Sequence, residues 1–144
     1  MNKITPFLYI GDARTAYALS EIDHPFDEVV TVGYARVLGK ECPRESTTGD
    51  EFVFPDGPHE YETFTDAADY TLKAIENGKV TFVHCQAGVS RSCSVCSAVL
   101  AVHGDIHIDE ARARVKQVRP RVDPEPRVWA SAVKYVEEHS QNSG

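Results

Sequence analysis

The sequence contains no run of eighteen consecutive apolar residues, the length that a membrane-spanning helix needs. Its first residues, MNKITPFLYIG, also lack the basic stretch and apolar core that mark a secretory signal peptide. We therefore expect a cytoplasmic protein with no membrane partner. Internal repeats, low-complexity tracts and long linkers are absent as well. Residues 1–144 are thus expected to form one domain, and its length is typical of one.

Basic residues are few: 15 Lys and Arg stand against 22 Asp and Glu, for a net charge of −7. Nucleic acids and anionic membranes are bound through concentrated positive charge. The composition therefore argues against both as partners. It leaves room for a small anionic substrate, because one well-placed arginine can outweigh a diffuse acidic surface.

Cysteine is also scarce, with one residue each at positions 42, 85, 93 and 96. Without a secretion signal, these are expected to be free thiols. Cys93 and Cys96 form a CxxC pair, but no second pair exists to complete a zinc site. They fall in an apolar stretch with a helical pattern, where cysteine usually acts as a small core residue. No metal site is predicted.

The apolar pattern predicts four short β-strands, at residues 7–11, 27–33, 51–57 and 80–83. The last of them, VTFV, is continuously apolar and β-branched, as expected of a central strand buried on both faces. Helical patterns alternate with these strands and follow them. This order predicts an α/β fold, with helices flanking a mainly parallel central sheet.

Five helices are predicted, each from a periodic apolar face. The first follows Asp12, a candidate N-cap, and the fourth begins at Asp109, another candidate cap. The second ends at the stop signal Asn77-Gly78, and the third covers SCSVCSAVLAVHG. The inward faces of the first and last helices are expected to carry Ala13, Ala16, Tyr17 and Ser20, and Trp129, Ala132, Val133 and Val136, respectively.

Residues 80–92, VTFVHCQAGVSRS, run from the predicted central strand through a loop into a helix. Ligands bind beyond the carboxyl ends of such strands, where Cys85 emerges. Backbone N–H groups in a curled loop form an anion nest, and the following helix adds its positive end. The predicted anion-binding residues are His84, Gln86, Ala87, Gly88, Val89 and Ser90, with His84 also orienting the loop and Ser90 shaping it.

The chemistry expected at this loop is nucleophilic attack on phosphorus. Arg91 can present two parallel N–H donors to phosphate, and a thiol in that positive field is expected to ionise, which makes Cys85 the candidate nucleophile. Water would then hydrolyse the phosphorylated cysteine without a cofactor. Asp56, in FPDGPHE, is the candidate general acid, and His59 nearby is a candidate substrate contact. The Ser92 hydroxyl is expected to assist departure of the sulfur.

VHCQAGVSRS resembles, without a gap, the His-Cys-x-x-Gly-x-Ser-Arg-Ser signature of the dual-specificity phosphatases in the cysteine-dependent protein tyrosine phosphatase superfamily. ITPFLYIGDARTA, FPDGPHE and ARARVKQVRP extend the likeness over nearly the whole chain. The resemblance implies a phosphatase fold and hydrolysis of phosphotyrosine, with phosphoserine and phosphothreonine as further options, in phosphorylated proteins. It implies Cys85 as nucleophile, Arg91 as phosphate clamp, Asp56 as acid then base, and Ser92 as the thiolate-releasing hydroxyl. The chain departs from the family at Glu125, where an asparagine is common.

Several alternatives remain open from the sequence. A lipid or RNA 5′-phosphatase of the same superfamily would want more positive charge, and Gln86, Ala87 and Val89 are neutral. A phosphoprotein-binding module would be expected to have lost the cysteine, the arginine or the acid, all of which are present. A redox role for Cys93 and Cys96 is disfavoured by their place inside a helix, although either could trap an oxidised Cys85 as a disulfide.

Overall fold

The structure is a computed structural model, and it describes residues 1–34, 36–37, 40–41 and 44–141. Cys42 lies outside the described residues. Within them, no helix is long and apolar enough to cross a membrane.

The central sheet has four strands in the order β1-β2-β6-β3. Strand β6 pairs in parallel with both β2 and β3, whereas β1 runs antiparallel to β2. All four residues of β6 are buried, which confirms the predicted central strand and the mainly parallel sheet. A separate antiparallel pair is formed by β4 and β5. The strands are β1 (Asn2–Thr5), β2 (Leu8–Gly11), β3 (Glu28–Thr31), β4 (Arg36–Val37), β5 (Lys40–Glu41) and β6 (Thr81–His84).

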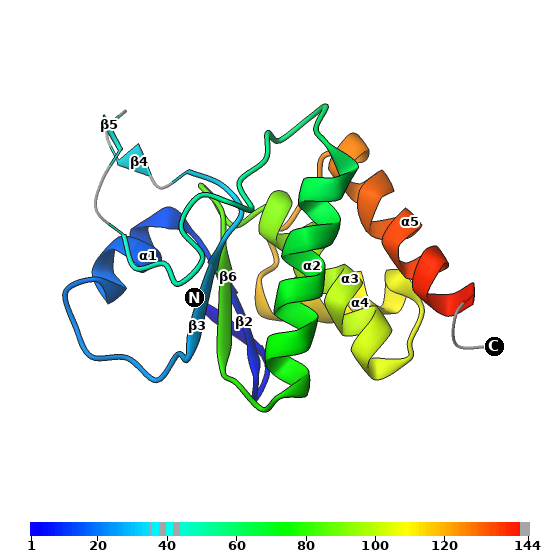
Figure 1. Ribbon diagram of the computed structural model, residues 1–144, viewed down its shortest axis with the longest axis horizontal. Helices are drawn as coiled ribbons and strands as arrows, with labels where there is room; N and C mark the ends of the chain where they lie inside the picture. Colours follow the sequence, from blue (N-terminus) through cyan, green and yellow to red (C-terminus); the bar gives the residue numbers. More distant parts are fainter. Residues whose placement is uncertain (35, 38–39, 42–43, 142–144) are drawn as a thin grey trace.

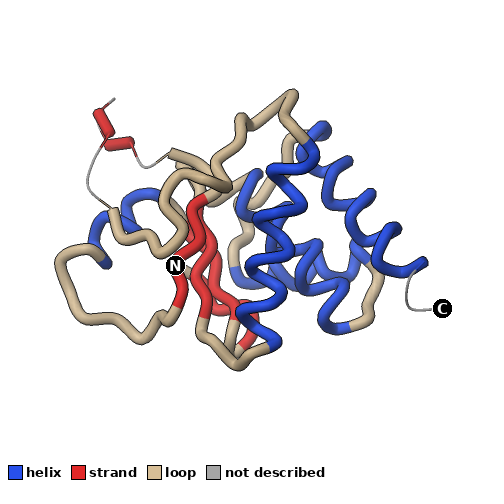
Figure 2. Tube along the Cα trace, in the orientation of Figure 1, coloured by secondary structure: helices blue, strands red, loops and turns tan. Residues whose placement is uncertain are grey.

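Helices cover both faces of this sheet. Helix α1 lies on one side of the strands and the other four helices lie on the opposite side (Figure 1). The tube view shows the strands of the central sheet as a single layer between them, with the β4–β5 pair apart from it (Figure 2). The helices are α1 (Ala13–Leu19), α2 (Tyr61–Glu76), α3 (Arg91–Gly104), α4 (Ile108–Val118) and α5 (Pro126–Gln141).

Helix α3 forms the centre of the larger core. Every residue from Ser92 to Ala101 is buried, because the helix packs against α2, α4 and α5 as well as β2 and β6. A smaller cluster on the other face of the sheet joins α1 to β3 and β6 through Ala16, Leu19, Val29 and Phe82. The core helix that starts directly after the Cys85 loop therefore gives that loop a rigid base.

The predicted strand at residues 51–57 is wrong, because these residues form turns and loop. Among the described residues, a single backbone hydrogen bond joins this segment to the residue after β3: the Phe54 N–H donates to the Val32 carbonyl at 3.3 Å. Pro55 has no N–H with which to continue a ladder. The two aromatic residues that suggested a strand have separate packing roles. Phe52 packs against Tyr70, and Phe54 is buried in the core.

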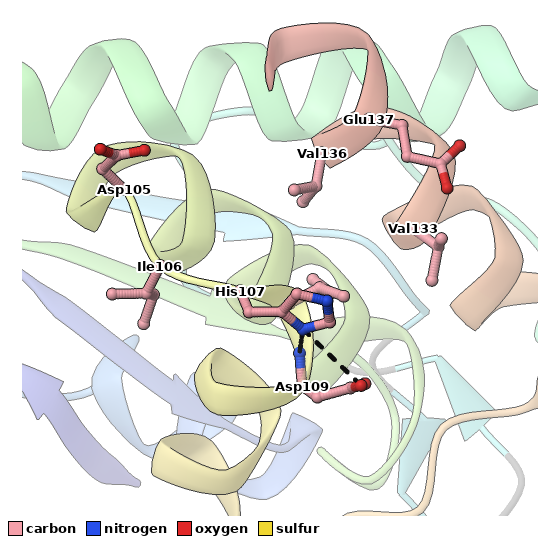
Figure 3. Close-up of a pocket in the computed structure, with 8 residues that line it drawn as sticks. Asp105, Ile106, His107, Asp109, Val133, Val136 and Glu137 are labelled. Atoms are coloured by element: carbon pink, nitrogen blue, oxygen red, sulfur yellow. Dashed lines mark hydrogen bonds and ion pairs between the residues drawn. The ribbon is translucent and has the colours of Figure 1, made fainter. Parts of the chain in front are cut away.

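Helix α4 begins two residues earlier than the pattern suggested. Its N-cap is His107, whose Nδ1 accepts from the Asp109 N–H at 3.1 Å, as Figure 3 shows. Asp109 therefore lies in the first turn, where its carboxylate interacts favourably with the helix dipole. The prediction of Asp109 as cap was wrong because an imidazole nitrogen supplied the acceptor instead. The Asp12 cap of α1 is confirmed, since its Oδ1 accepts from the Thr15 N–H at 2.9 Å.

The inward faces of two helices are rotated from those predicted. In α1, Tyr17 is 40% exposed and Leu19 is buried in its place. In α5, Val128 and Tyr135 are buried with Ala132, and the predicted Trp129, Val133 and Val136 are only partly buried. Tyr135 reaches the core because its hydroxyl donates to Asp69 Oδ1 at 2.7 Å, which satisfies its polar end.

Candidate active site

Cys85 directly follows β6, at the carboxyl edge of the sheet, and its side chain is buried. Its Sγ lies 3.3 Å from the hydroxyl of Ser92, a fully buried residue in the first turn of α3. The strand therefore delivers the sulfur to the N-terminus of the core helix. The structure brings together the two residues that the sequence pattern paired as nucleophile and releasing hydroxyl.

The loop between Cys85 and Arg91 is held by its backbone carbonyls. Four consecutive carbonyl oxygens accept hydrogen bonds from other parts of the chain. The bonds are Ala13 N–H to Gln86 O (3.0 Å), Arg119 Nη2 to Ala87 O (3.0 Å), Arg119 Nε to Gly88 O (2.7 Å) and Asp123 N–H to Val89 O (2.9 Å).

These carbonyl bonds fix the direction of the loop's N–H groups. The described residues contain no cis peptide bond, and in a trans peptide unit the N–H points opposite to the C=O. Carbonyls that face the surrounding donors therefore turn the N–H groups of residues 87–90 the other way, toward the inside of the loop. Gly88 has φ +67°, and a Cβ there would lie 2.6 Å from the Gly11 carbonyl oxygen, so only glycine fits. The result is an anion nest in front of α3.

Arg119 clamps the outside of this loop, and sequence reasoning missed it. It is only 7% exposed, and besides its bonds to Ala87 and Gly88 it donates to Asn2 Oδ1 at 2.8 Å and to Asp12 Oδ2 at 3.3 Å. Burial alone would raise the pKa of Asp12, but hydrogen bonds from Thr15 and the Arg119 charge outweigh it and hold that pKa below its usual value. No local pattern marks Arg119, because its acceptors lie 31 or more positions away.

The Arg91 guanidinium lies beside Cys85. A Cβ placed on Gly33 would be 2.7 Å from Arg91 Cζ and 2.9 Å from Cys85 Cβ, so both groups border the same point. Arg91 Nη1 also donates to the Phe54 carbonyl at 3.0 Å. Gly33, which follows the end of β3, therefore leaves the space that the guanidinium occupies. The sequence shows a glycine after a predicted strand, but nothing in it indicates that the glycine makes space for Arg91.

His84 is fully buried at the end of β6. Its Nε2 lies 2.8 Å from the Thr31 hydroxyl of β3, and its ring stacks on Phe82. Burial lowers its pKa to about 4, so the imidazole is neutral at physiological pH. With no exposed surface, the side chain supports the strand ends beneath the loop.

The remaining loop side chains differ in exposure. Gln86 and Ala87 are exposed and Val89 is half-buried, whereas Gly88 and Ser90 are buried. The Ser90 hydroxyl accepts from the Glu125 N–H at 2.7 Å, so it does hold the loop's shape.

Glu125, the departure from the family pattern, has a structural role of its own. Its carboxylate accepts from the N–H groups of Arg127 and Val128 at 2.8 and 3.1 Å, at the start of α5. It therefore caps that helix, and its negative charge interacts favourably with the helix dipole there.

Asp56 lies in the loop between Phe54 and α2. Its side chain is exposed, and it forms no hydrogen bond or ion pair with the part of the chain that the structure describes. The loop starts at Phe54, whose carbonyl is bonded to Arg91. Asp56 is therefore two residues from a direct contact with the arginine of the anion-binding loop.

Residues 55–138 match the family model described as the dual specificity phosphatase catalytic domain. The chain belongs to this family. It is 30% identical over 135 residues to mouse dual specificity phosphatase 28, covering 92% of this chain and 82% of that protein. It is also 30% identical to Xenopus laevis dual specificity protein phosphatase 1-A, covering 85% of this chain but only 33% of the relative. The chain thus spans about a third of the length of that larger protein.

Among solved structures, the fold is similar to that of a mouse putative dual specificity phosphatase complexed with zinc tungstate. The TM-score is 0.76 at 25% sequence identity, covering 99% of this chain and 89% of the other. The expected protein tyrosine phosphatase-like fold is therefore confirmed.

The third and fourth cysteines of the chain are core residues, as predicted. Cys93 and Cys96 have no exposed surface, and burial raises the pKa of Cys93 to about 11 and that of Cys96 well above its usual value. Both are thiols at neutral pH, which argues against a redox-active pair. Trapping of an oxidised Cys85 by either one stays a prediction.

No cluster of three or more His, Cys, Asp or Glu side chains in the described ranges could hold a metal ion. His103 and His107, spaced four apart in the sequence, are both exposed, on either side of the end of α3.

A cavity lies elsewhere, between the α3–α4 connection and α5, with a volume of about 680 Å³ (Figure 3). Its described lining includes the carboxylates of Asp105, Asp109 and Glu137 around apolar Ile106 and Val136, and no lysine or arginine. Three carboxylates would repel a phosphate group. The cavity shares no lining residue with the anion-binding loop, and its charge does not suit a phosphate.

Proposed function

We propose that this chain is a metal-independent phosphomonoester hydrolase that acts on phosphotyrosine in proteins through a cysteinyl-phosphate intermediate. Phosphoserine and phosphothreonine are further candidate substrates. One observation carries the proposal: the carbonyls of residues 86–89 are all bonded from outside the loop, which turns the N–H groups of residues 87–90 inward, beside Cys85 and the Arg91 guanidinium. A tetrahedral dianion fits such a cradle, and the nucleophile stands at its base.

The first step transfers the phosphoryl group to the protein. The Cys85 thiolate attacks phosphorus, a P–S bond forms, and the bond from phosphorus to the leaving oxygen breaks. Arg91 and the loop N–H groups hold the phosphoryl oxygens, whose charge they stabilise in the transition state. Asp56 donates its proton to the leaving oxygen, so that the product departs as an alcohol or a phenol.

The second step releases inorganic phosphate. Asp56, now a carboxylate, accepts a proton from a water molecule that attacks phosphorus. The P–S bond breaks and the electron pair returns to Cys85. The Ser92 hydroxyl, 3.3 Å from that sulfur, donates a hydrogen bond that stabilises the departing thiolate.

The partner that we propose is a phosphorylated protein in the cytoplasm, and nucleic acid is not a proposed partner because the net charge is −7. The exposed Arg121 and Arg127 near the loop are paired with Asp12 and Glu125. To bind these arginines, a polyphosphorylated lipid headgroup or an RNA end would have to break both ion pairs. We assign residues 1–144 to one phosphatase catalytic domain.

Hydrolysis of p-nitrophenyl phosphate in the presence of EDTA tests the proposal. Wild-type protein, freshly reduced, is expected to turn over, Cys85→Ser to be inactive, and Asp56→Asn to lose about 10²-fold or more in kcat. Activity that persists in Cys85→Ser would overturn the cysteine mechanism. Loss on Cys85→Ser with none on Asp56→Asn would leave the nucleophile in place and move the acid role to another residue. An inactive wild type that still binds phosphopeptide would favour a binding module.

A further inference from the structure

The short segment that carries Asp56 is held at both ends by side chains. On one side, the Phe54 carbonyl accepts from Arg91 Nη1 at 3.0 Å. On the other, the Gly57 carbonyl lies 2.6 Å from Nδ1 of His59. The backbone is therefore fixed two residues before Asp56 and one residue after it, while the Asp56 carboxyl itself stays exposed.

His59 is in turn fixed to helix α5. Its Nε2 lies 2.7 Å from the hydroxyl of Ser131, a residue that is 8% exposed. Its ring packs against Phe54, with ring centroids 5.2 Å apart, and more loosely against Phe64. Since Phe54 is buried in the core, the imidazole is held from three directions.

The two hydrogen bonds determine which nitrogen of the neutral ring carries the proton. A carbonyl oxygen can only accept, so Nδ1 must carry the proton that it donates to Gly57. In the neutral ring, Nε2 is then an acceptor, and the Ser131 hydroxyl donates to it. The Gly57 carbonyl thereby selects the tautomer, and the Ser131 hydroxyl holds that tautomer in place by donating to Nε2.

We propose that His59 is a positioning residue that holds the Asp56 carboxyl over the Cys85 loop through the Gly57 carbonyl. This inference rests on the proposed function, because it assumes Asp56 to be the general acid. His59 transfers no proton to the substrate itself. It restricts the segment 54–57, so that little ordering of Asp56 remains to be done when the substrate binds.

A general acid matters most when the leaving group is a poor one, since a weakly acidic alcohol cannot depart without its proton. A misplaced Asp56 should thus slow phenyl phosphate more than p-nitrophenyl phosphate, whose leaving group departs as a stable anion. General damage to the fold would lower both rates equally. The ratio of the two kcat/KM values is also independent of the fraction of protein that is folded.

The experiment compares His59→Asn with His59→Gln on both substrates. The amide nitrogen of asparagine can occupy the place of Nδ1, whereas that of glutamine corresponds to Nε2. We expect His59→Gln to lose about 10- to 100-fold in kcat/KM on phenyl phosphate and about threefold or less on p-nitrophenyl phosphate. His59→Asn should keep most of the kcat/KM on phenyl phosphate that His59→Gln loses.

His139→Ala is the matched control. Its Nδ1 lies 2.7 Å from the Tyr135 carbonyl, a bond of the same kind on α5, remote in sequence from the Asp56 segment. In His139→Ala, the ratio of kcat/KM on phenyl phosphate to kcat/KM on p-nitrophenyl phosphate should equal that of wild type. Equal losses on both substrates in His59→Gln, or the same ratio in the asparagine and glutamine variants, would overturn the inference. A wild type without Cys85-dependent turnover would instead overturn the proposed function, and the inference with it.

Discussion

At the scale of single residues, Gly33 is a position in the site where a side chain has no room. Gly33 leaves the space in which the Arg91 guanidinium meets Cys85, and an added Cβ would lie less than 3 Å from both. Contacts this short do not persist in a packed structure, so a neighbour has to move. Since the Arg91 guanidinium is only partly buried, we expect it to be displaced from Cys85.

Gly33→Ala is therefore predicted to lower kcat/KM by about 10²-fold, because displacement of a phosphate-binding group by about 1 Å is enough for such a loss. The measurement is steady-state hydrolysis of p-nitrophenyl phosphate. Gly104→Ala is the control, since its nearest neighbour to an added Cβ is 3.9 Å away, in ordinary contact. A Gly33→Ala variant as active as Gly104→Ala would show that the guanidinium does not need this space.

At the scale of elements, the anion-binding loop gains its shape from segments far from it in sequence. Its carbonyls are bound by α1, by Arg119 at the end of α4 and by the segment that leads to α5. The loop is therefore rigid before any ligand arrives. Because the loop is already ordered, less conformational entropy is lost when phosphate binds.

Arg119→Lys tests this view, because an ammonium cannot reach all four acceptors that the guanidinium fork serves. Buried acceptors left without donors should lower the free energy of unfolding by about 2 kcal/mol, and kcat/KM should fall by about tenfold or more. Urea denaturation and steady-state hydrolysis of p-nitrophenyl phosphate measure the two effects.

Arg121→Lys is the matched control for that variant. It contacts the same Asp12 carboxylate and Ala87 carbonyl, but its side chain is 62% exposed. Exposed pairs contribute little, so its change in unfolding free energy should stay within about 0.5 kcal/mol. Equal effects in the two variants would contradict a special role for the buried arginine.

At the scale of the whole molecule, His84 links stability to pH. Its pKa is about 4 in the folded protein because burial disfavours the charged ring, against a usual value near 6.5. Between these values the unfolded chain binds the proton and the folded protein does not. The free energy of unfolding should therefore fall as pH drops from about 6.5 to about 4, by an amount on the order of 3 kcal/mol.

Urea denaturation at several pH values between 7 and 4 measures this slope, and His84→Asn should flatten it. His103→Asn, at an exposed position, should leave the slope unchanged. Asp12 and Glu28 also have lowered pKa values, so their contributions are lost at lower pH, below the usual carboxyl range. A slope that survives in His84→Asn would show that another group binds the proton.

The order of the central strand, the loop and the core helix could be predicted from the amino-acid sequence, because apolar periodicity and the glycine-bearing signature are local properties. The sequence also paired Cys85 with Ser92, whose separation of seven residues a tight loop can close. Only the tertiary structure revealed Arg119, Gly33 and the His59–Ser131 bond, since each depends on contacts between distant segments. For the same reason it corrected the strand at 51–57: pairing in a sheet needs a neighbour in space, and a pattern along the chain does not supply one.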